Sequence, residues 1–391
     1  MKRREKILKR AVIVLLSVAS VLVLIVAFLN WRASRKVEAR LAPLREAGKP
    51  ITIEDIQPSS IPDEQNAAKA VEPYSEAIES FDRQMAEATR SRETDLQGIA
   101  GYILVTKRVA KEFPKLNDAL RSAAVLPVYQ PHLDYSLDPS SFMEQVLNQP
   151  VSLRTIVRAL YGHGLMSLAE GKPDEAAEDA IAILNWTQLT AKQPLIVNQL
   201  VSTACYSQGV KLAAQCLYAD DISPEKGASL IHTCSNESAM LANHSIAIDT
   251  ERAFGIASFD SFPGSRRMWL LGELAAYLDV MAEFQSIAEH PTGLAPNEPN
   301  TPSIFASLTR PAMQQSIVAL RRQQALSRAI RVLAASQDAN DTAPASLIDP
   351  FDGSEMRVKP VGDSIAVYSV GADLVDDGGS IEDGRDIGIA P

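Results

Sequence analysis

The longest uninterrupted hydrophobic stretch of the chain lies near its N-terminus. Residues 11–29 (AVIVLLSVASVLVLIVAFL) contain no charged side chain and only two serines. At a rise of about 1.5 Å per residue, a helix of this length spans about 28 Å, close to the ~30 Å hydrocarbon core of a bilayer. Trp31 follows at interfacial depth, and basic residues crowd both ends of the stretch. The pattern therefore predicts a basic tail at 1–10 and, at 11–29, a transmembrane anchor that binds the lipid bilayer.

Two other interpretations of this stretch stay open. A cleaved signal peptide has an apolar region of about 7–15 residues that ends in a small-x-small site, whereas residues 11–29 are longer and continue directly into Asn30 and Trp31. A buried core helix is the other alternative.

The orientation of the anchor depends on the basic residues around it. Six Lys and Arg residues precede the stretch and six follow it, so the positive-inside rule is close to a tie. The preceding six are packed directly against the apolar residues. We therefore expect the N-terminus in the cytoplasm, the anchor in the inner membrane and the body of the protein in the periplasm.

Beyond the anchor, apolar residues recur at helical spacing over most of the chain. Residues 30–62 are expected to form a stalk and connector, and 63–290 an irregular helical domain. The clearest unit is 151–193, where Gly171 ends one helix and Pro173 begins the next, which predicts an αα-hairpin. Its stretch AEGKPDEAAEDAIAIL resembles the turn and second helix of a tetratricopeptide-type (TPR-like) hairpin. The resemblance covers about one repeat, and an array needs about three.

The pattern changes near residue 300. Four prolines within 291–302 predict a linker and a domain boundary. In the following module, 303–391, an amphipathic helix at 312–336 precedes two short strand patterns, 356–360 and 365–370, joined by a Gly-Asp turn. The predicted fold is mainly α: an N-terminal transmembrane helix, an irregular helical body, and a small C-terminal α+β module with a β-hairpin and an acidic loop.

Charge divides the chain into two unlike parts. The 391 residues carry a net charge of −10, but residues 1–49 contain twelve Lys and Arg against three acids, so the remainder carries −19. A body this acidic repels phosphate backbones, and we therefore expect no nucleic-acid partner. The content of 46% hydrophobic and 22% charged residues is that of a globular chain, which excludes wholesale disorder.

Six carboxylates lie within the fourteen residues 373–386. Glycines at 378, 379 and 384 would allow the sharp turns that gather oxygen atoms, and calcium accepts about six to eight oxygen ligands in irregular geometry. The spacing does not match an EF-hand, and zinc would need His or Cys, which 303–391 lacks. Composition alone leaves two alternatives open, a calcium site and a flexible acidic tail.

The same region contains short motifs in a specific order: Asp349-Pro350-Phe351-Asp352-Gly353, then Tyr368-Ser369-Val370-Gly371-Ala372-Asp373, then Asp386-Ile387. With these motifs, the last ~75 residues resemble the C-terminal module of the major pseudopilin of type II secretion. That family binds calcium in the corresponding loop. The resemblance therefore implies bound Ca²⁺ and five candidate metal ligands, the best two named first: Asp373, Asp386, Asp376, Asp377 and Asp383.

Several features depart from the pseudopilin pattern. Leu374 stands where the family has Gly, Phe351 where it has Trp, and the N-terminus lacks a prepilin peptidase site. About 270 residues separate the anchor from the module, so we do not expect polymerisation as a pseudopilus subunit. The overall plan, with Asn66-Ala67-Ala68 at a helix start, resembles single-pass envelope proteins common in planctomycetes. That resemblance implies no activity.

The sequence contains no recognisable catalytic motif. Its five histidines are scattered without HExxH, and GxSxG, Walker A and GxGxxG patterns are absent. Cys205, Cys216 and Cys234 show no CxxC spacing, and we expect buried free thiols. The main prediction is a membrane-anchored, non-enzymatic envelope protein whose helical body contacts other proteins.

The alternative is a hydrolase-like enzyme with a site near residues 125–163. His163 stands between two glycines, and the Pro-rich segment 125–150 contains four side chains suited to line a groove: Tyr129, His132, Tyr135 and Phe142. Aromatic residues in a long loop more often hold the loop by packing. A histidine in the middle of a helix is likewise more typical of helix packing than of catalysis.

Overall fold

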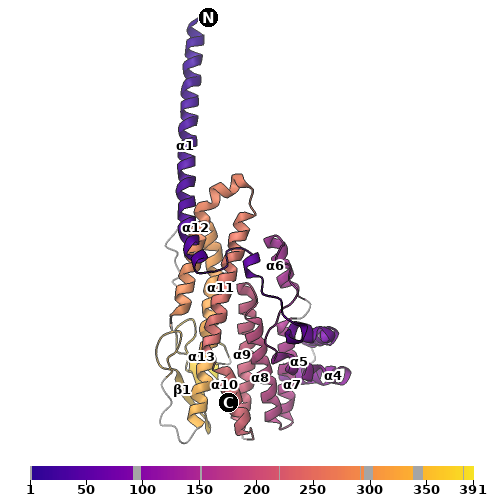
Figure 1. Cartoon of the computed structure of the whole chain (residues 1–391). Coiled ribbons are helices and arrows are strands. Elements are labelled where there is room, and N and C mark those ends of the chain that lie inside the picture. Colours follow the sequence, from indigo (N-terminus) through magenta and orange to yellow (C-terminus); the bar gives the residue numbers. More distant parts are fainter. Residues whose placement is uncertain are drawn as a thin grey trace.

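The computed structural model describes residues 2–90, 98–149, 152–219, 221–290, 292–294, 303–337, 347–381 and 383–391. A long N-terminal helix projects from a helical body, and a small antiparallel sheet lies at the other end of that body (Figure 1). This arrangement confirms the predicted fold class, mainly α with a small C-terminal β-hairpin module.

Helix α1 (Lys2–Glu46) is a single helix of 45 residues. It contains an 18-residue window with a mean hydropathy of 3.2, and none of that window is buried against the body. Only the C-terminal part of α1 packs against the body, where Val37 and Leu41 are buried and the helix contacts α12 (Gly264–Glu289). The chain therefore has one N-terminal helix that is long and apolar enough to span a membrane, as predicted.

Helices α2 to α12 form the body. Their bounds are Ala67–Val71 (α2), Ser75–Arg90 (α3), Gly98–Glu112 (α4), Leu116–Ala124 (α5), Pro139–Leu147 (α6), Leu153–Ala169 (α7), Pro173–Thr190 (α8), Ile196–Tyr218 (α9), Pro224–Cys234 (α10), Glu237–Asp260 (α11) and Gly264–Glu289 (α12).

Helices α7 and α8 form the αα-hairpin predicted from residues 151–193. Gly171 has a φ of 71°, the left-handed conformation that ends a helix at low cost when no Cβ is present. Pro173 is the first residue of α8. Trp186 on α8 is fully buried, and its Nε1 donates a hydrogen bond to the Leu120 carbonyl at 2.9 Å. Helix α9 packs against α7, α8, α11 and α13, and thus lies at the centre of the core.

The C-terminal sheet has the strand order β1-β2-β3. Strands β1 (Arg357–Val361) and β2 (Ser364–Ser369) form the predicted antiparallel hairpin, in which Val358 lies opposite Val367. Strand β3 (Ile387–Ile389) pairs with the other edge of β2. The sequence pattern does not predict β3, because three residues are too few to show alternation.

Most of the predicted linker 291–302 lies outside the described residues, apart from 292–294. Helix α13 (Ile304–Gln337) begins earlier than the predicted residue 312, because Pro311 is accommodated inside the helix. Helix α13 packs against α9 and α12, and one hydrophobic cluster extends from Val37 on α1 to Ile389 on β3. Residues on both sides of the linker thus share a core, and a domain boundary there remains a prediction.

Candidate functional site

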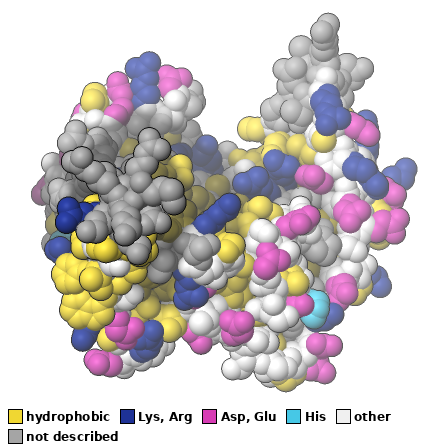
Figure 2. Space-filling view, turned by 90° about the horizontal axis from the view of Figure 1, so that it is seen from above, with side chains coloured by type: hydrophobic (Ala, Val, Ile, Leu, Met, Phe, Trp, Pro, Cys, Tyr) yellow, Lys and Arg dark blue, Asp and Glu magenta, His cyan; other side chains and the backbone are white. Residues whose placement is uncertain are grey.

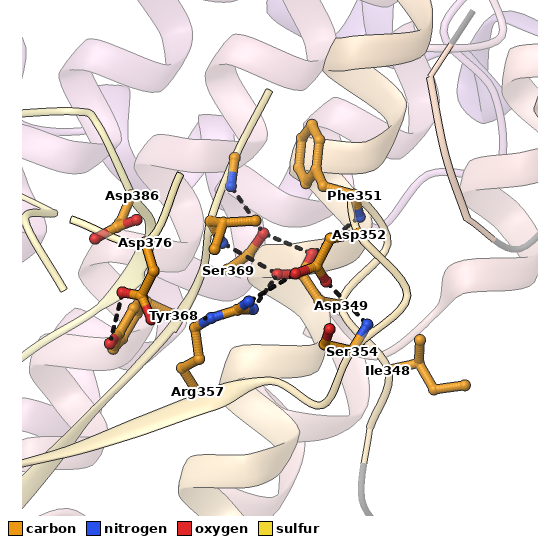
Figure 3. A network of polar contacts seen from close by, with 12 residues as sticks. Ile348, Asp349, Phe351, Asp352, Ser354, Arg357, Tyr368, Ser369, Asp376 and Asp386 are labelled. Atoms are coloured by element: carbon orange, nitrogen blue, oxygen red, sulfur yellow. Dashed lines mark hydrogen bonds and ion pairs between the residues drawn. The ribbon is translucent and has the colours of Figure 1, made fainter. Parts of the chain in front are cut away.

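The C-terminal module contains a polar network centred on Asp349 (Figure 3). The side chain of Asp349 is fully buried at the turn that precedes β1. Its carboxylate accepts hydrogen bonds from the Ser369 hydroxyl at 2.8 Å, from the backbone N–H groups of Phe351 at 2.9 Å and Val370 at 3.0 Å, and from Arg357 Nη1 at 2.9 Å. A buried carboxylate is tolerated only with such partners. The network therefore fixes the turn against β2.

Arg357 on β1 joins two aspartates of the turn before β1 to a third in the acidic loop. Its guanidinium lies 2.9 Å from Asp349, 2.6 Å from Asp352 and 3.3 Å from Asp376. Burial is the largest single influence and raises the pKa of Asp352, but the hydrogen bonds from Arg357 and Ser354 and the positive charge of Arg357 together exceed it and bring this pKa below its ordinary value. A single cation thus offsets the repulsion among three carboxylates.

Asp386 holds the acidic loop from its inner side. It is 1% exposed, and its Oδ2 accepts hydrogen bonds from the backbone N–H groups of Gly379 at 2.8 Å and Ser380 at 2.9 Å. Because Asp386 immediately precedes β3, these bonds tie the loop to the edge of the sheet. The loop is therefore folded around a carboxylate.

The other four predicted metal ligands point to separate partners. Asp376 pairs with Arg357 as described, and the remaining three are matched as follows: Asp373 with the Val375 N–H at 3.2 Å, Asp377 with Arg385 at 3.5 Å, and Asp383 with the Ser380 hydroxyl at 3.2 Å. Within the described part of the chain, no group of three or more His, Cys, Asp or Glu side chains is placed to hold a metal ion. The five acids do not gather at one point in this arrangement, and calcium remains a prediction from the sequence.

Asp349 and Arg357 were not among the residues predicted for the site. The motif containing Asp349 entered only as part of the pseudopilin resemblance, and Arg357 only as part of the strand predicted at 356–360. The signal available was an aspartate between Ile348 and Pro350, in an apolar stretch that continues with Phe351. Such a carboxylate needs buried donors, but the sequence does not show where they come from.

His163 lies in a second polar cluster, between α5, α7 and α8. Its Nδ1 is 2.7 Å from Oδ2 of Asp179, which is fully buried. Oδ1 of Asp179 accepts hydrogen bonds from Arg121 Nε at 2.7 Å and from Asn117 Nδ2 at 3.0 Å. His163 also lines a cavity of about 70 Å³ with Thr106, whose hydroxyl has no partner among the described residues. The cluster joins three helices and places an imidazole–carboxylate pair beside a cavity.

The segment 125–150 contributes to a different cavity. Tyr129 lines a space of about 210 Å³ with residues of α6, α7, α8 and α9, and burial raises the pKa of this tyrosine to about 12. Tyr135 and Phe142 belong to a separate hydrophobic cluster in which their ring centroids lie 5.4 Å apart. These two rings hold the loop by packing. His132 is exposed and lines neither of the two cavities.

The three cysteines are free and buried, as predicted. Burial raises the pKa of each thiol to about 12. The thiolate is the nucleophilic form, so these residues are unreactive in the folded protein.

Comparison with known proteins assigns the chain to no family. No protein-family model matches the chain, and neither the curated proteins nor the solved structures include a significant match. The resemblances to the pseudopilin module and to planctomycete envelope proteins therefore remain predictions.

Proposed function

We propose that this protein is a single-pass protein of the inner membrane, with its N-terminus in the cytoplasm and a periplasmic helical body that binds other proteins. One observation carries the proposal. Along α1, hydrophobic side chains such as Leu15 and Leu24 are 72% and 68% exposed, whereas Val37 and Leu41 of the same helix are buried against the body. An exposed apolar surface of this length needs a lipid environment.

The cavity beside Tyr129 supports the binding role. Its lining combines apolar side chains with three amides, those of Gln149, Gln193 and Asn198. Amide groups both donate and accept hydrogen bonds, as recognition of a peptide backbone requires. Leu147 at this cavity is 59% exposed, so an apolar contact is available beside the amides. We propose that a segment of a protein partner inserts here.

The anchoring part of the proposal is tested by membrane fractionation of the full-length chain. Wild type should remain in the membrane pellet after an alkaline wash. The double variant Leu16→Arg, Val23→Arg should be released, because each arginine near the bilayer centre costs about 2.5–3.5 kcal/mol. The control Leu16→Ile, Val23→Ile should behave as wild type. Recovery of wild type in the soluble fraction would contradict the proposal.

A second candidate function is favoured by a separate observation, the His163–Asp179 pair beside the cavity of about 70 Å³. An oriented imidazole is the commonest general base in hydrolases. The purified chain would be assayed on ester and peptide substrates. A hydrolase would show turnover that His163→Gln abolishes and His132→Gln leaves unchanged. Turnover that survives His163→Gln would exclude this site.

A further inference from the structure

Helix α1 is held against the body by contacts with two other helices. On α12, Asp279 binds the Arg40 guanidinium through both carboxylate oxygens, each at 2.6 Å. On α11, Asp249 binds Lys49, just beyond the end of α1, at 2.6 Å. Leu41 lies between Arg40 and Lys49 in the sequence, and its buried side chain adds an apolar contact. The direction in which α1 leaves the body is therefore fixed by the structure.

The turn between α11 and α12 lies at the end of the body from which α1 projects (Figure 1). Trp269 precedes Asp279 on α12 by ten residues, which corresponds to about 15 Å along a helix. Ten residues before Arg40 on α1 is Asn30, directly after the apolar stretch. Because Arg40 and Asp279 are in contact, Trp269 and Asn30 lie at about the same height above that contact.

A second estimate uses α11 and agrees. From Asp249, α11 continues toward the turn for eleven residues to its end at Asp260, about 16 Å. The same distance, measured along α1 from its C-terminal end at Glu46 toward the N-terminus, reaches Arg35. Both estimates bring residues 260–270, here called the α11–α12 tip, to within about one or two helical turns of the end of the apolar stretch.

The side chains of the α11–α12 tip suit the surface of a bilayer. Trp269 is 67% exposed, and Arg266 and Arg267 beside it are also exposed. Arg267 pairs with Asp260 at 2.7 Å, so the three charges of the tip sum to one positive charge. Tryptophan concentrates at membrane interfaces, and arginine binds phosphate groups.

Neighbouring elements present the same kind of surface. Ile304, at the start of α13, is 71% exposed, and the hydroxyl of the preceding Ser303 binds Glu273 of α12, one turn beyond Trp269, at 2.6 Å. On α1, three exposed basic residues lie just after the apolar stretch: Arg32, Arg35 and Lys36. Figure 2 looks onto this end of the body and shows Lys and Arg side chains together with hydrophobic and acidic ones. The charges of the tip together with those of Arg32, Arg35 and Lys36 sum to +4, whereas the whole chain carries a net charge of −10.

We infer that the α11–α12 tip is a second membrane contact. Trp269 lies at the boundary between headgroups and acyl chains, and Arg266 and Arg267 bind lipid phosphates of the same bilayer that α1 spans. This inference rests on the proposed anchoring. Contact at two points would fix the tilt of the body against the membrane, so that its binding cavity keeps a constant orientation.

The test uses tryptophan fluorescence of the full-length chain in vesicles of phosphatidylcholine and phosphatidylglycerol, with and without acyl chains brominated near the headgroup. The chain has three tryptophans, and Trp186 is fully buried. In Trp31→Phe the lipid-dependent signal comes from Trp269, and in Trp269→Phe it comes from Trp31. The double variant gives the background of Trp186. We expect brominated lipid to quench both single variants more than the double variant.

A matched control places a tryptophan at the opposite end of the body. Val361→Trp in the double variant puts an exposed indole on β1, where no quenching by brominated lipid is expected. Arg266→Glu with Arg267→Glu, in the Trp31→Phe background, should lose the quenching of Trp269 in vesicles that contain phosphatidylglycerol. Unchanged circular dichroism melts would show that these variants keep the fold.

The two proposals fail in different ways. Quenching of Trp31 without quenching of Trp269 would overturn the second contact and leave the anchoring intact. Quenching of neither would contradict the anchoring and, with it, the second contact. Emission of Trp269 that changes with the protein-to-lipid ratio but not with bromination would show that another copy of the chain covers the tip, and would overturn the inference.

Discussion

Asp386 and Asp373 have different surroundings, although sequence analysis placed both first among the predicted metal ligands. Asp386 is buried and accepts backbone hydrogen bonds, whereas Asp373 is exposed. Asp386→Ala leaves the part-buried N–H groups of Gly379 and Ser380 without their acceptor, at a cost of about 1 kcal/mol each, so we expect a marked loss of stability. Asp373→Ala should change the free energy of unfolding by less than about 0.5 kcal/mol. Urea unfolding followed by circular dichroism compares the two variants.

The same pair of variants tests the predicted calcium site. Each of the five acids already has a hydrogen-bond donor or a cationic partner. We therefore expect millimolar calcium and EDTA to leave the melting temperature of the wild type unchanged. A rise in melting temperature with calcium that Asp386→Ala abolishes would instead establish the metal site that the sequence predicted.

We expect His244 on α11 to make the protein sensitive to acid. Burial, followed by the nearby charge of Arg321, lowers the pKa of this imidazole from 6.5 to about 4. The folded protein therefore keeps His244 neutral where the unfolded chain protonates it. The contribution of neutral His244 to the free energy of unfolding is fully present above pH ~6.5. It is lost as the pH falls toward 4, by about 3 kcal/mol in total.

The acid sensitivity is measured by urea unfolding at pH 7 and pH 4.5. His244→Gln should lose less stability between these two values than wild type does, whatever its stability at pH 7, because the variant has no imidazole to protonate. An equal loss in both proteins would show that other groups cause the acid sensitivity.

The packing of helices α8 and α9 depends on Gly209. A Cβ atom at this position would lie 2.9 Å from Cγ2 of Ile183, closer than real Cβ atoms come. Gly209→Ala should therefore destabilise the body by about 1–3 kcal/mol. Gly272 on α12 has open space around it, and Gly272→Ala should stabilise the helix by about 0.5–1 kcal/mol. Thermal unfolding distinguishes them, and equal effects would contradict the close approach of α8 and α9.

Elements with local signals could be predicted from the sequence, and those that depend on distant partners could not. Gly171 and Pro173 mark the hairpin of α7 and α8 because the conformation of each residue acts locally. Strand β3 forms only because β2 offers a free edge, and no pattern within three residues encodes that. The Asp179 cluster likewise brings in Arg121 from another helix, 58 positions away in the sequence.

At the scale of the whole molecule, α1 combines two roles in one helix. Its apolar part needs a lipid environment, and its last turns belong to the core of the body. A flexible linker after the anchor would let the body rotate freely. Here the continuous helix and the Arg40–Asp279 ion pair hold one end of the body toward the apolar part of α1. The location proposed for that body, on the periplasmic side, has to be tested on the full-length chain.

Labelling of Val361→Cys with a membrane-impermeant maleimide–polyethylene glycol tests this arrangement in intact cells with a permeabilised outer membrane. The native cysteines are buried, so wild type should not react and serves as the control. We expect the variant to shift on a gel before the inner membrane is lysed, at the size of the full-length chain. Labelling only after lysis, or a labelled band shortened by the mass of the anchor, would contradict a permanently anchored body outside the inner membrane.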